Sequence, residues 1–374
     1  MRTTHYAQFE LRHWHRLLGA GAGHVTRTRR VLEEYFGRPV VLLNSGRTGI
    51  FLALAAYGFE RQEDVWVPPW LSSCVLNTIS RQGLPTLQRS PRTRAVLIVH
   101  QWGYPQRIER ILRTARRDNL LVIEDCAFSF DSSYDGNRIG SFGDAAVFSF
   151  PKVLGSILGG CLVTDDERIL GFAENYMRQQ DTAFWRWRSK VALAPMALAL
   201  GTRDGRFNTW VRHWLERCHA DFVFCPNPNP YVCKLFPESV AALRETFKAR
   251  RGNLAVFRST FGEETYPRSL EEGSDVVPYL IPWFGPAEAF PNVVAALQTI
   301  GVETGVYHFD VNRDMSASDY RKCVAVPVHQ RITIKRMREI CETIAAAASR
   351  RPAMAAGKPE GATEQADKGA ASHD

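Results

Sequence analysis

A single lysine, Lys152, lies in an apolar stretch of the chain, VFSFPKVLGSILGG at residues 147–160. A strand-like run ends at Pro151, and no other charged residue occurs in the stretch before it closes at Gly159 and Gly160. Burial disfavours the ammonium form of such a lysine and frees the amine to act as a nucleophile toward carbonyl groups. The alternative interpretation is a lysine whose charged end reaches solvent.

Two other short motifs carry groups suited to chemistry. NSGRTG at 44–49 reads as a strand, a small-residue turn and a helix start, so backbone N–H groups of Gly46, Arg47 and Thr48 could hold a phosphate. VIEDCA at 122–127 is an apolar strand that ends in two carboxylates, the second being Asp125. Such a carboxylate can cap a helix, bind a metal or pair with a cation. Both motifs end predicted strands, where open α/β sheets bind ligands.

The order of the three motifs along the chain indicates which cofactor they could bind. A phosphate-binding turn precedes Asp125, and Lys152 follows 27 residues after Asp125. A pyridoxal 5′-phosphate (PLP) site needs these groups: a turn for the phosphate, a carboxylate that keeps the pyridine nitrogen protonated, and a lysine that carries the aldehyde. The sequence therefore predicts a PLP site and no bound metal.

The elements that must position these residues follow from the apolar pattern. Short apolar runs alternate with helical patterns over the first 170 residues. Helices are expected at 48–57, 72–83 and 105–119, and strands at 39–45, 64–69, 94–100, 120–126, 143–150 and 159–166. Continuous β-branched strands separated by helices are typical of a mainly parallel sheet covered on both faces.

The rest of the chain divides into further regions. We predict a large cofactor-binding domain at 1–255, a smaller C-terminal α/β domain at 256–348 and a disordered Ala/Gly-rich tail at 349–374. The large domain includes an atypical Arg/Trp-rich helical insertion at 185–220. Its apolar core, 190–201, is too short to span a membrane and either packs inside the protein or makes a weak membrane-surface contact.

Composition limits the possible partners and compartment. The net charge of +8 is too scattered for a nucleic-acid-binding face, although it suits an anionic small molecule. The eight cysteines are irregularly spaced, which favours reduced thiols in a cytoplasmic enzyme. Cys218, His219, Cys225 and Cys233 lie close in sequence without the paired spacing of a zinc site.

The motifs together resemble the DegT/DnrJ/EryC1/StrS family of PLP-dependent sugar aminotransferases, which have the PLP-enzyme fold type I with a seven-stranded sheet. The likeness covers about 30–170 and 275–345 and is most specific over 122–166. It is carried by SGRTGI, VHQWGYPQRIERI, VIEDCA, YDGNRIGSFGDAAVFSF, GGCLVTDDE, VETGVYHF and CVAVPVHQRITIKRM.

The resemblance implies roles for individual residues. Lys152 would hold the cofactor aldehyde and act as the base that moves the proton. Asp125 would pair with the pyridinium nitrogen and Ser149 would help hold the phosphate. Arg47 and Thr48, with Gly46, would supply phosphate contacts from the first turn.

The chain departs from the family pattern at several positions. The turn before Lys152 is two residues shorter, and Phe128 replaces a Gln or His that contacts the cofactor ring. The aromatic residue often stacked on that ring aligns near Ser72, with Trp70 a possible substitute. The Asn/Arg loop that the family gives to a partner subunit is not recognisable, although Lys234 could stand in.

The activity implied by the resemblance is transfer of an amino group, from glutamate, to a nucleotide-linked keto-sugar by a cytoplasmic homodimer. Such reactions serve cell-surface polysaccharide or secondary-metabolite synthesis. One alternative is a sugar dehydratase that uses the aminated cofactor, but the family's dehydratases carry histidine where this chain has Lys152. A second alternative is a degenerate PLP-fold protein with a non-catalytic or regulatory role.

Overall fold

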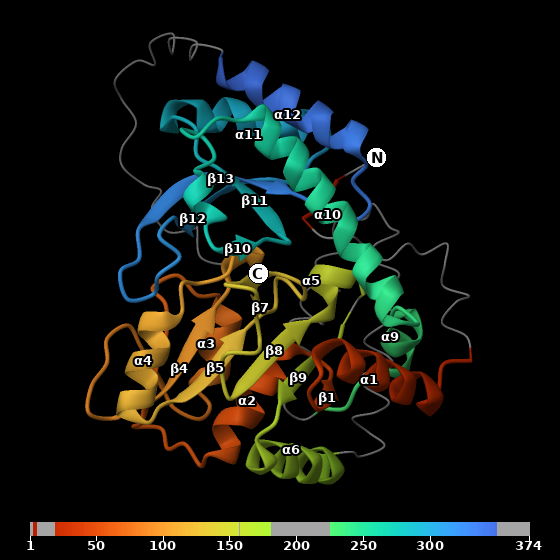
Figure 1. Cartoon of the computed structure of the whole chain (residues 1–374), viewed down its shortest axis with the longest axis vertical. Coiled ribbons are helices and arrows are strands. Elements are labelled where there is room, and N and C mark those ends of the chain that lie inside the picture. The colour runs from red at the N-terminus through yellow and green to blue at the C-terminus, as the bar shows by residue number, and fades with distance from the viewer. Residues whose placement is uncertain (1–2, 6–18, 157, 181–224, 350–374) are drawn as a thin grey trace, which may run out of the picture.

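The computed structural model describes residues 3–5, 19–156, 158–180 and 225–349 of the chain. Figure 1 shows a large sheet with helices on both faces and, above it, a small sheet beside which α11 and α12 pack. This arrangement confirms the predicted α/β class. The predicted insertion at 185–220 and the predicted tail, apart from its first residue, lie outside the described residues.

The large sheet has seven strands in the order β1-β9-β8-β5-β4-β2-β3. The five strands from β8 to β3 run parallel, whereas β9 is antiparallel to both of its neighbours, so the sheet is mainly parallel as predicted. The strands are β1 (Val40–Leu43), β2 (Asp64–Trp66), β3 (Leu84–Thr86), β4 (Thr93–Val99), β5 (Leu121–Asp125), β8 (Ala145–Ser149) and β9 (Gly160–Thr164).

Both faces of this sheet are buried, as its apolar strands require. One face carries Leu97 of β4, which belongs to the same core as α2, α3 and α6. The opposite face carries Ile98 of β4, which packs with α4. Helix α1 covers another part of this second face. These helices are α1 (Ala22–Phe36), α2 (Gly46–Ala56), α3 (Ser73–Ile79), α4 (Glu109–Asp118) and α6 (Glu167–Gln180).

The small unit has its own sheet and core. Its strands are antiparallel in the order β11-β13-β12, and Val324 and Val326 of β13 are fully buried. The elements are β11 (Leu280–Trp283), α11 (Phe290–Thr299), β12 (Val306–Asp310), β13 (Tyr320–Pro327) and α12 (Ile334–Ala348). These elements form a small α/β unit with a core of its own.

One long helix, α10 (Val240–Thr260), belongs to both units. Its first half packs in the core of the large unit through Leu243 and Phe247, and its second half packs in the small core through Leu254 and Phe257. Figure 1 shows α10 running along one side of the molecule from the small unit toward α9 (Pro230–Leu235) and α1. The predicted boundary at residue 255 thus falls inside a continuous helix.

Some short elements differ from the expected ones. The strand expected at 64–69 ends at Trp66 because two prolines follow, and the helix expected from residue 105 begins at Glu109. The sequence pattern did not predict β3, β6 (Ser133–Tyr134), β7 (Asn137–Arg138) or β10 (Ser274–Asp275). None of the helices in the described part of the chain combines the length and hydrophobicity that a membrane crossing needs.

Candidate active site

Three predicted site segments meet at one edge of the large sheet. β5 and β8 are parallel neighbours, with Asp125 opposite Val147, so Asp125 and Ser149 end adjacent strands. β1 runs in the same direction as β8, because β9 is antiparallel to both. The turn that follows β1 therefore reaches the same edge as Asp125 and Ser149.

Gly160 lets the turn after β1 approach β8 closely. It pairs with Leu43 on one side and with Ser149 on the other. A Cβ atom at Gly160 would lie 2.4 Å from the Phe148 carbonyl oxygen and 2.5 Å from the Gly46 nitrogen. Only glycine fits between these backbones, so residue 160 sets the separation of the turn from the strand.

The turn itself is held by its own side chains. The Ser45 hydroxyl accepts from the Thr48 N–H at 3.4 Å and caps α2, and the buried Thr48 hydroxyl donates to Asn44 Oδ1 at 2.5 Å. Thr48 therefore stabilises the turn with its hydroxyl. The first N–H groups of any helix lack an acceptor inside the helix, so the start of α2 is suited to binding an anion.

Asp125 is a buried carboxylate close to a positive charge. It is 5% exposed, and its Oδ1 accepts from the Ala127 N–H at 2.9 Å. Burial raises the pKa of Asp125, and the nearby charge of Lys152 opposes that rise. The structure thus brings together the two residues that the sequence selected as carboxylate and amine.

Lys152 lies on α5 (Phe150–Leu154), a helix of one turn that begins directly after β8. Its side chain is half-buried, and Nζ lies 3.9 Å from the centre of the Phe128 ring. Pro151 is accommodated in the first turn, where its missing N–H costs no hydrogen bond. Ser149 precedes the helix, and its hydroxyl makes no hydrogen bond to other described residues.

Comparison with known proteins adds an independent observation. The sequence profile of the DegT/DnrJ/EryC1/StrS aminotransferase family matches residues 90–191. A GDP-perosamine synthase from Escherichia coli O157:H7 is 33% identical over 147 residues, which cover 34% of this chain and 40% of that protein. The chain aligns with about two fifths of the length of the first curated relatives it matches.

Two solved structures superpose along nearly their whole length. A DegT DnrJ EryC1 StrS aminotransferase from Brucella abortus has a TM-score of 0.67 and 17% identity, covering 91% of this chain and 97% of that one. The PLP form of a putative sugar aminotransferase from Streptococcus pneumoniae has a TM-score of 0.67 and 15% identity, covering 92% and 97%. The fold is that of the DegT/DnrJ/EryC1/StrS aminotransferases. The resemblance found in the sequence motifs is confirmed by these matches.

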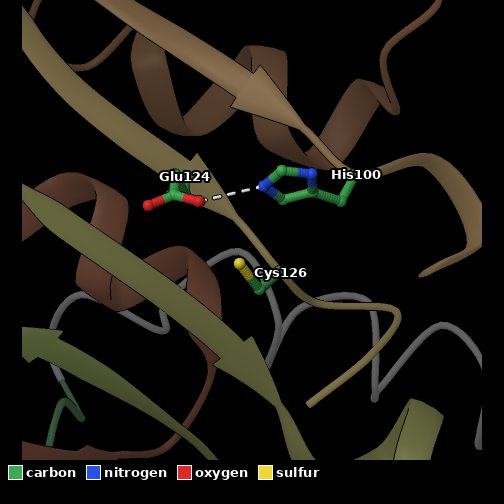
Figure 2. A group of neighbouring side chains, drawn as sticks. All are labelled: His100, Glu124 and Cys126. Carbon is green, nitrogen blue, oxygen red and sulfur yellow. Dashed lines mark hydrogen bonds and ion pairs between the residues drawn. The ribbon is translucent and has the colours of Figure 1, made fainter. Parts of the chain in front are cut away.

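Within this aminotransferase fold, a hydrogen-bonded cluster fixes the end of β5. Figure 2 shows the Glu124 carboxylate facing the His100 imidazole, with Cys126 beside them. His100 Nδ1 accepts from the Gln106 N–H at 3.1 Å, so Nε2 carries the proton and donates to Glu124 at 3.0 Å. Glu124 also accepts three backbone N–H groups, which belong to Gly140, Phe142 and Gly143.

The side chains of this cluster are of types that bind metals, but their ligand atoms are not available to a metal ion. Both carboxylate oxygens of Glu124 already accept two hydrogen bonds each, and His100 uses both ring nitrogens. Burial raises the pKa of the Cys126 thiol well above its usual range, whereas metals bind the thiolate. We therefore interpret it as a support that holds Asp125, the next residue after Glu124, in place.

Trp70, a candidate for stacking on the cofactor ring, has another partner here. Its ring stacks on that of His308 in β12, with centroids 4.1 Å apart and an angle of 12° between planes. Trp70 is 53% exposed and lies on the loop after β2. It therefore joins the large unit to the small sheet. Lys234 lies near the end of α9.

One residue that contacts Lys152 belongs to none of the sequence motifs. Arg250 of α10 is 1% exposed and donates to the carbonyl oxygen of Lys152 at 3.2 Å. A signal was present in the sequence. Arg250 falls within the apolar stripe formed by Leu243, Phe247, Leu254 and Phe257, where a charged residue requires an explanation.

Proposed function

We propose that this chain is a PLP-dependent aminotransferase that moves an amino group from glutamate to a nucleotide-linked keto-sugar. The observation that carries the proposal is the Asp125–Lys152 pair, which lies at the edge of the sheet reached by the N-terminus of α2. This donor set fits PLP: a buried carboxylate for the ring nitrogen, a single amine, and a helix start with the Ser149 hydroxyl for the phosphate.

Each residue would perform a distinct task. Bound here, PLP would supply an aldehyde carbon that takes up amines and a ring that withdraws electrons from it. Asp125 would keep a proton on the ring nitrogen, because an ionised buried carboxylate is stabilised by an adjacent cation. Lys152 would hold the aldehyde and then, once displaced by substrate, carry the proton between the two reacting carbons with its Nζ.

The substrate, assembly and compartment belong to the same proposal. The relative from Escherichia coli is named for a GDP-linked amino sugar. The net charge of +8 suits a pyrophosphate-linked substrate. We expect a homodimer, as the family resemblance implies. A cytoplasmic location is supported by the seven described cysteines, all of which are free.

The first experiment tests cofactor attachment. The purified full chain is incubated with PLP, reduced with borohydride and mapped by peptide mass spectrometry. We expect a single phosphopyridoxyl group on Lys152, its absence in Lys152→Ala, and full labelling in the matched control Lys248→Ala, since Lys248 is exposed on α10. A label elsewhere, or no label in the unsubstituted chain, would show that the proposal is wrong.

The second experiment tests the reaction. The PLP-loaded protein is mixed with glutamate and a panel of nucleotide-linked 3- and 4-keto-sugars, and 2-oxoglutarate and amino-sugar are measured. Formation of both in equal amounts supports the aminotransferase. Loss of a sugar hydroxyl without amine transfer would indicate the dehydratase instead. Cofactor attachment without turnover of any sugar would favour a different substrate class, and failure to bind PLP would favour the non-catalytic alternative.

A further inference from the structure

The helix that carries Lys152 is too short to satisfy its own backbone. α5 has five residues, ends at Leu154 and is capped by Gly155, which has a φ of 71°. The last four carbonyl groups of any helix have no partner inside it, so a helix of this length relies on donors from elsewhere. The direction of the Lys152 side chain therefore depends on what holds these carbonyl oxygens.

Arg250 supplies those donors. Its Nη2 donates to the carbonyl oxygens of Lys152 at 3.2 Å and Val153 at 3.0 Å. Its Nη1 donates to the Pro278 carbonyl at 3.0 Å, and Nη2 also reaches Gln330 Oε1 at 3.4 Å. The planar guanidinium thus joins α5 to two segments of the small unit.

The charge of Arg250 makes these bonds hard to break. The side chain is 1% exposed, and no described carboxylate forms an ion pair with it. Burial lowers the pKa of Arg250 to about 10, which leaves it charged at neutral pH. A buried cation without a counter-ion is stabilised only by the oxygens around it, so moving α5 away would expose an unpaired charge.

The same segment also fixes the other end of the lysine. Tyr279, the residue after Pro278, packs against Phe128 with ring centroids 5.1 Å apart, and the Lys152 amine lies over the Phe128 ring. Residues 278 and 279 therefore support both the backbone carbonyl of Lys152, through Arg250, and its amine, through Phe128.

We propose that Arg250 is a positioning residue that aims the Lys152 amine by holding the carbonyl oxygens of Lys152 and Val153. Its meaning for catalysis rests on the function proposed above, but the positioning of α5 does not. Arg250 also contacts Pro278 and Gln330 of the small unit. The orientation of Lys152 therefore depends on the position of the small unit relative to the large one.

The test compares two neighbouring arginines on one helix. Arg250→Met removes the contacts to α5, whereas Arg251→Met removes ion pairs to Asp131 and Asp275 and leaves α5 untouched. Hydrogen–deuterium exchange is measured on the cofactor-free full chains. We expect residues 150–156 to exchange roughly tenfold faster in Arg250→Met and within about twofold of the unsubstituted rate in Arg251→Met.

A chemical readout accompanies the exchange measurement. The rate at which PLP and borohydride label Lys152 is expected to fall roughly tenfold in Arg250→Met and to recover in part in Arg250→Lys, whose ammonium reaches some of the same oxygens. A purely structural role would not show this rescue. If Arg250→Met does not fold, as judged by circular dichroism, Arg250→Lys and Arg251→Lys are compared instead. Exchange at residues 150–156 is then expected to rise, by less than about tenfold, in Arg250→Lys and to stay at the unsubstituted rate in Arg251→Lys.

The two proposals fail in different ways. Exchange at 150–156 that stays at the unsubstituted rate in the Arg250 variant, or rises equally in the Arg251 variant, would overturn the positioning role. Absence of labelling in the unsubstituted chain would overturn the proposed function alone, and the exchange data would still decide the role of Arg250.

Discussion

The Lys152 amine lies 3.9 Å from the centre of the Phe128 ring, and that ring packs in turn against Tyr279. An aromatic face attracts an ammonium group by about 0.5–2 kcal/mol but offers no hydrogen bond to a bound cofactor. In the family pattern this position carries a Gln or His that contacts the cofactor ring. Phe128 lacks that polar contact, and its ring instead packs against the Lys152 amine.

Phe128→Gln should therefore bind PLP more tightly than the unsubstituted chain. The amide can hydrogen-bond to a polar group of the cofactor ring, and a net hydrogen bond of about 1–1.5 kcal/mol corresponds to roughly tenfold in affinity. The dissociation constant is measured by titrating the cofactor-free chain with PLP. Phe128→Leu is the control and should show no gain; equal affinities in the two variants would contradict the prediction.

Asp125→Asn should stabilise the cofactor-free fold while weakening PLP binding. Burial raises the pKa of Asp125, so the ionised carboxylate weakens the fold once the pH exceeds its unfolded pKa of about 4. Asparagine keeps an oxygen for the Ala127 N–H without the charge. We expect a gain of about 1–2 kcal/mol in unfolding free energy at pH 7, and at least roughly tenfold weaker PLP binding.

The matched control for this change is Asp135→Asn in the β6–β7 turn. Asp135 is exposed and has a φ of 46°, which asparagine adopts as readily as aspartate. Urea unfolding at pH 7 and at pH 3 separates the two sites. The increase in unfolding free energy caused by Asp125→Asn should disappear at pH 3, where residue 125 is uncharged in both proteins. An increase that persists at pH 3 would show that burial of a charge is not its cause.

Gly160→Ala should disrupt the edge that carries the site. Its Cβ would lie 2.4 Å from the Phe148 carbonyl oxygen and 2.5 Å from the Gly46 nitrogen, so two backbones would have to separate. We expect a loss of about 3 kcal/mol in unfolding free energy, measured by urea titration. Gly171→Ala in α6, where a Cβ meets no atom within 4 Å, should instead gain about 0.5–1 kcal/mol. Equal effects at both positions would contradict this account.

His329 should make the fold sensitive to mild acid. Burial, with Arg250 and Arg331 nearby, lowers the pKa of His329 to about 3. The unfolded chain binds this proton below about pH 6.5, so the stability that neutral His329 contributes is complete above that pH and is lost as the pH falls toward 3. His329→Asn keeps an acceptor for the Arg331 N–H. Between pH 7 and pH 4 the free energy of unfolding of this variant should fall by about 3 kcal/mol less than that of the unsubstituted chain. If the free energies of unfolding of the two proteins change with pH in parallel, His329 is not the source of the acid sensitivity.

Local sequence determined most of the elements and the chemical character of the site. The apolar runs that became β1, β4, β5, β8 and β9 are continuous because both faces of the sheet are covered, and that pattern is visible in the sequence itself. Asp125 and Lys152 could be predicted as site residues because Asp125 ends one apolar run and Lys152 follows another. Two- and three-residue strands such as β6 and β3 carry no periodicity of their own and form only because a partner strand lies beside them.

The tertiary structure alone decided which residues meet. Phe128 could be assigned to a position in a motif, but its ring lies against the Lys152 amine only because the end of β5 lies beside the start of α5. Arg250 is separated from Lys152 by 98 positions, and its apolar neighbours indicate burial without naming the carbonyl groups it contacts. Local periodicity sets an element's type because it acts within a few residues, whereas partners across the fold are set by packing and strand register between distant segments.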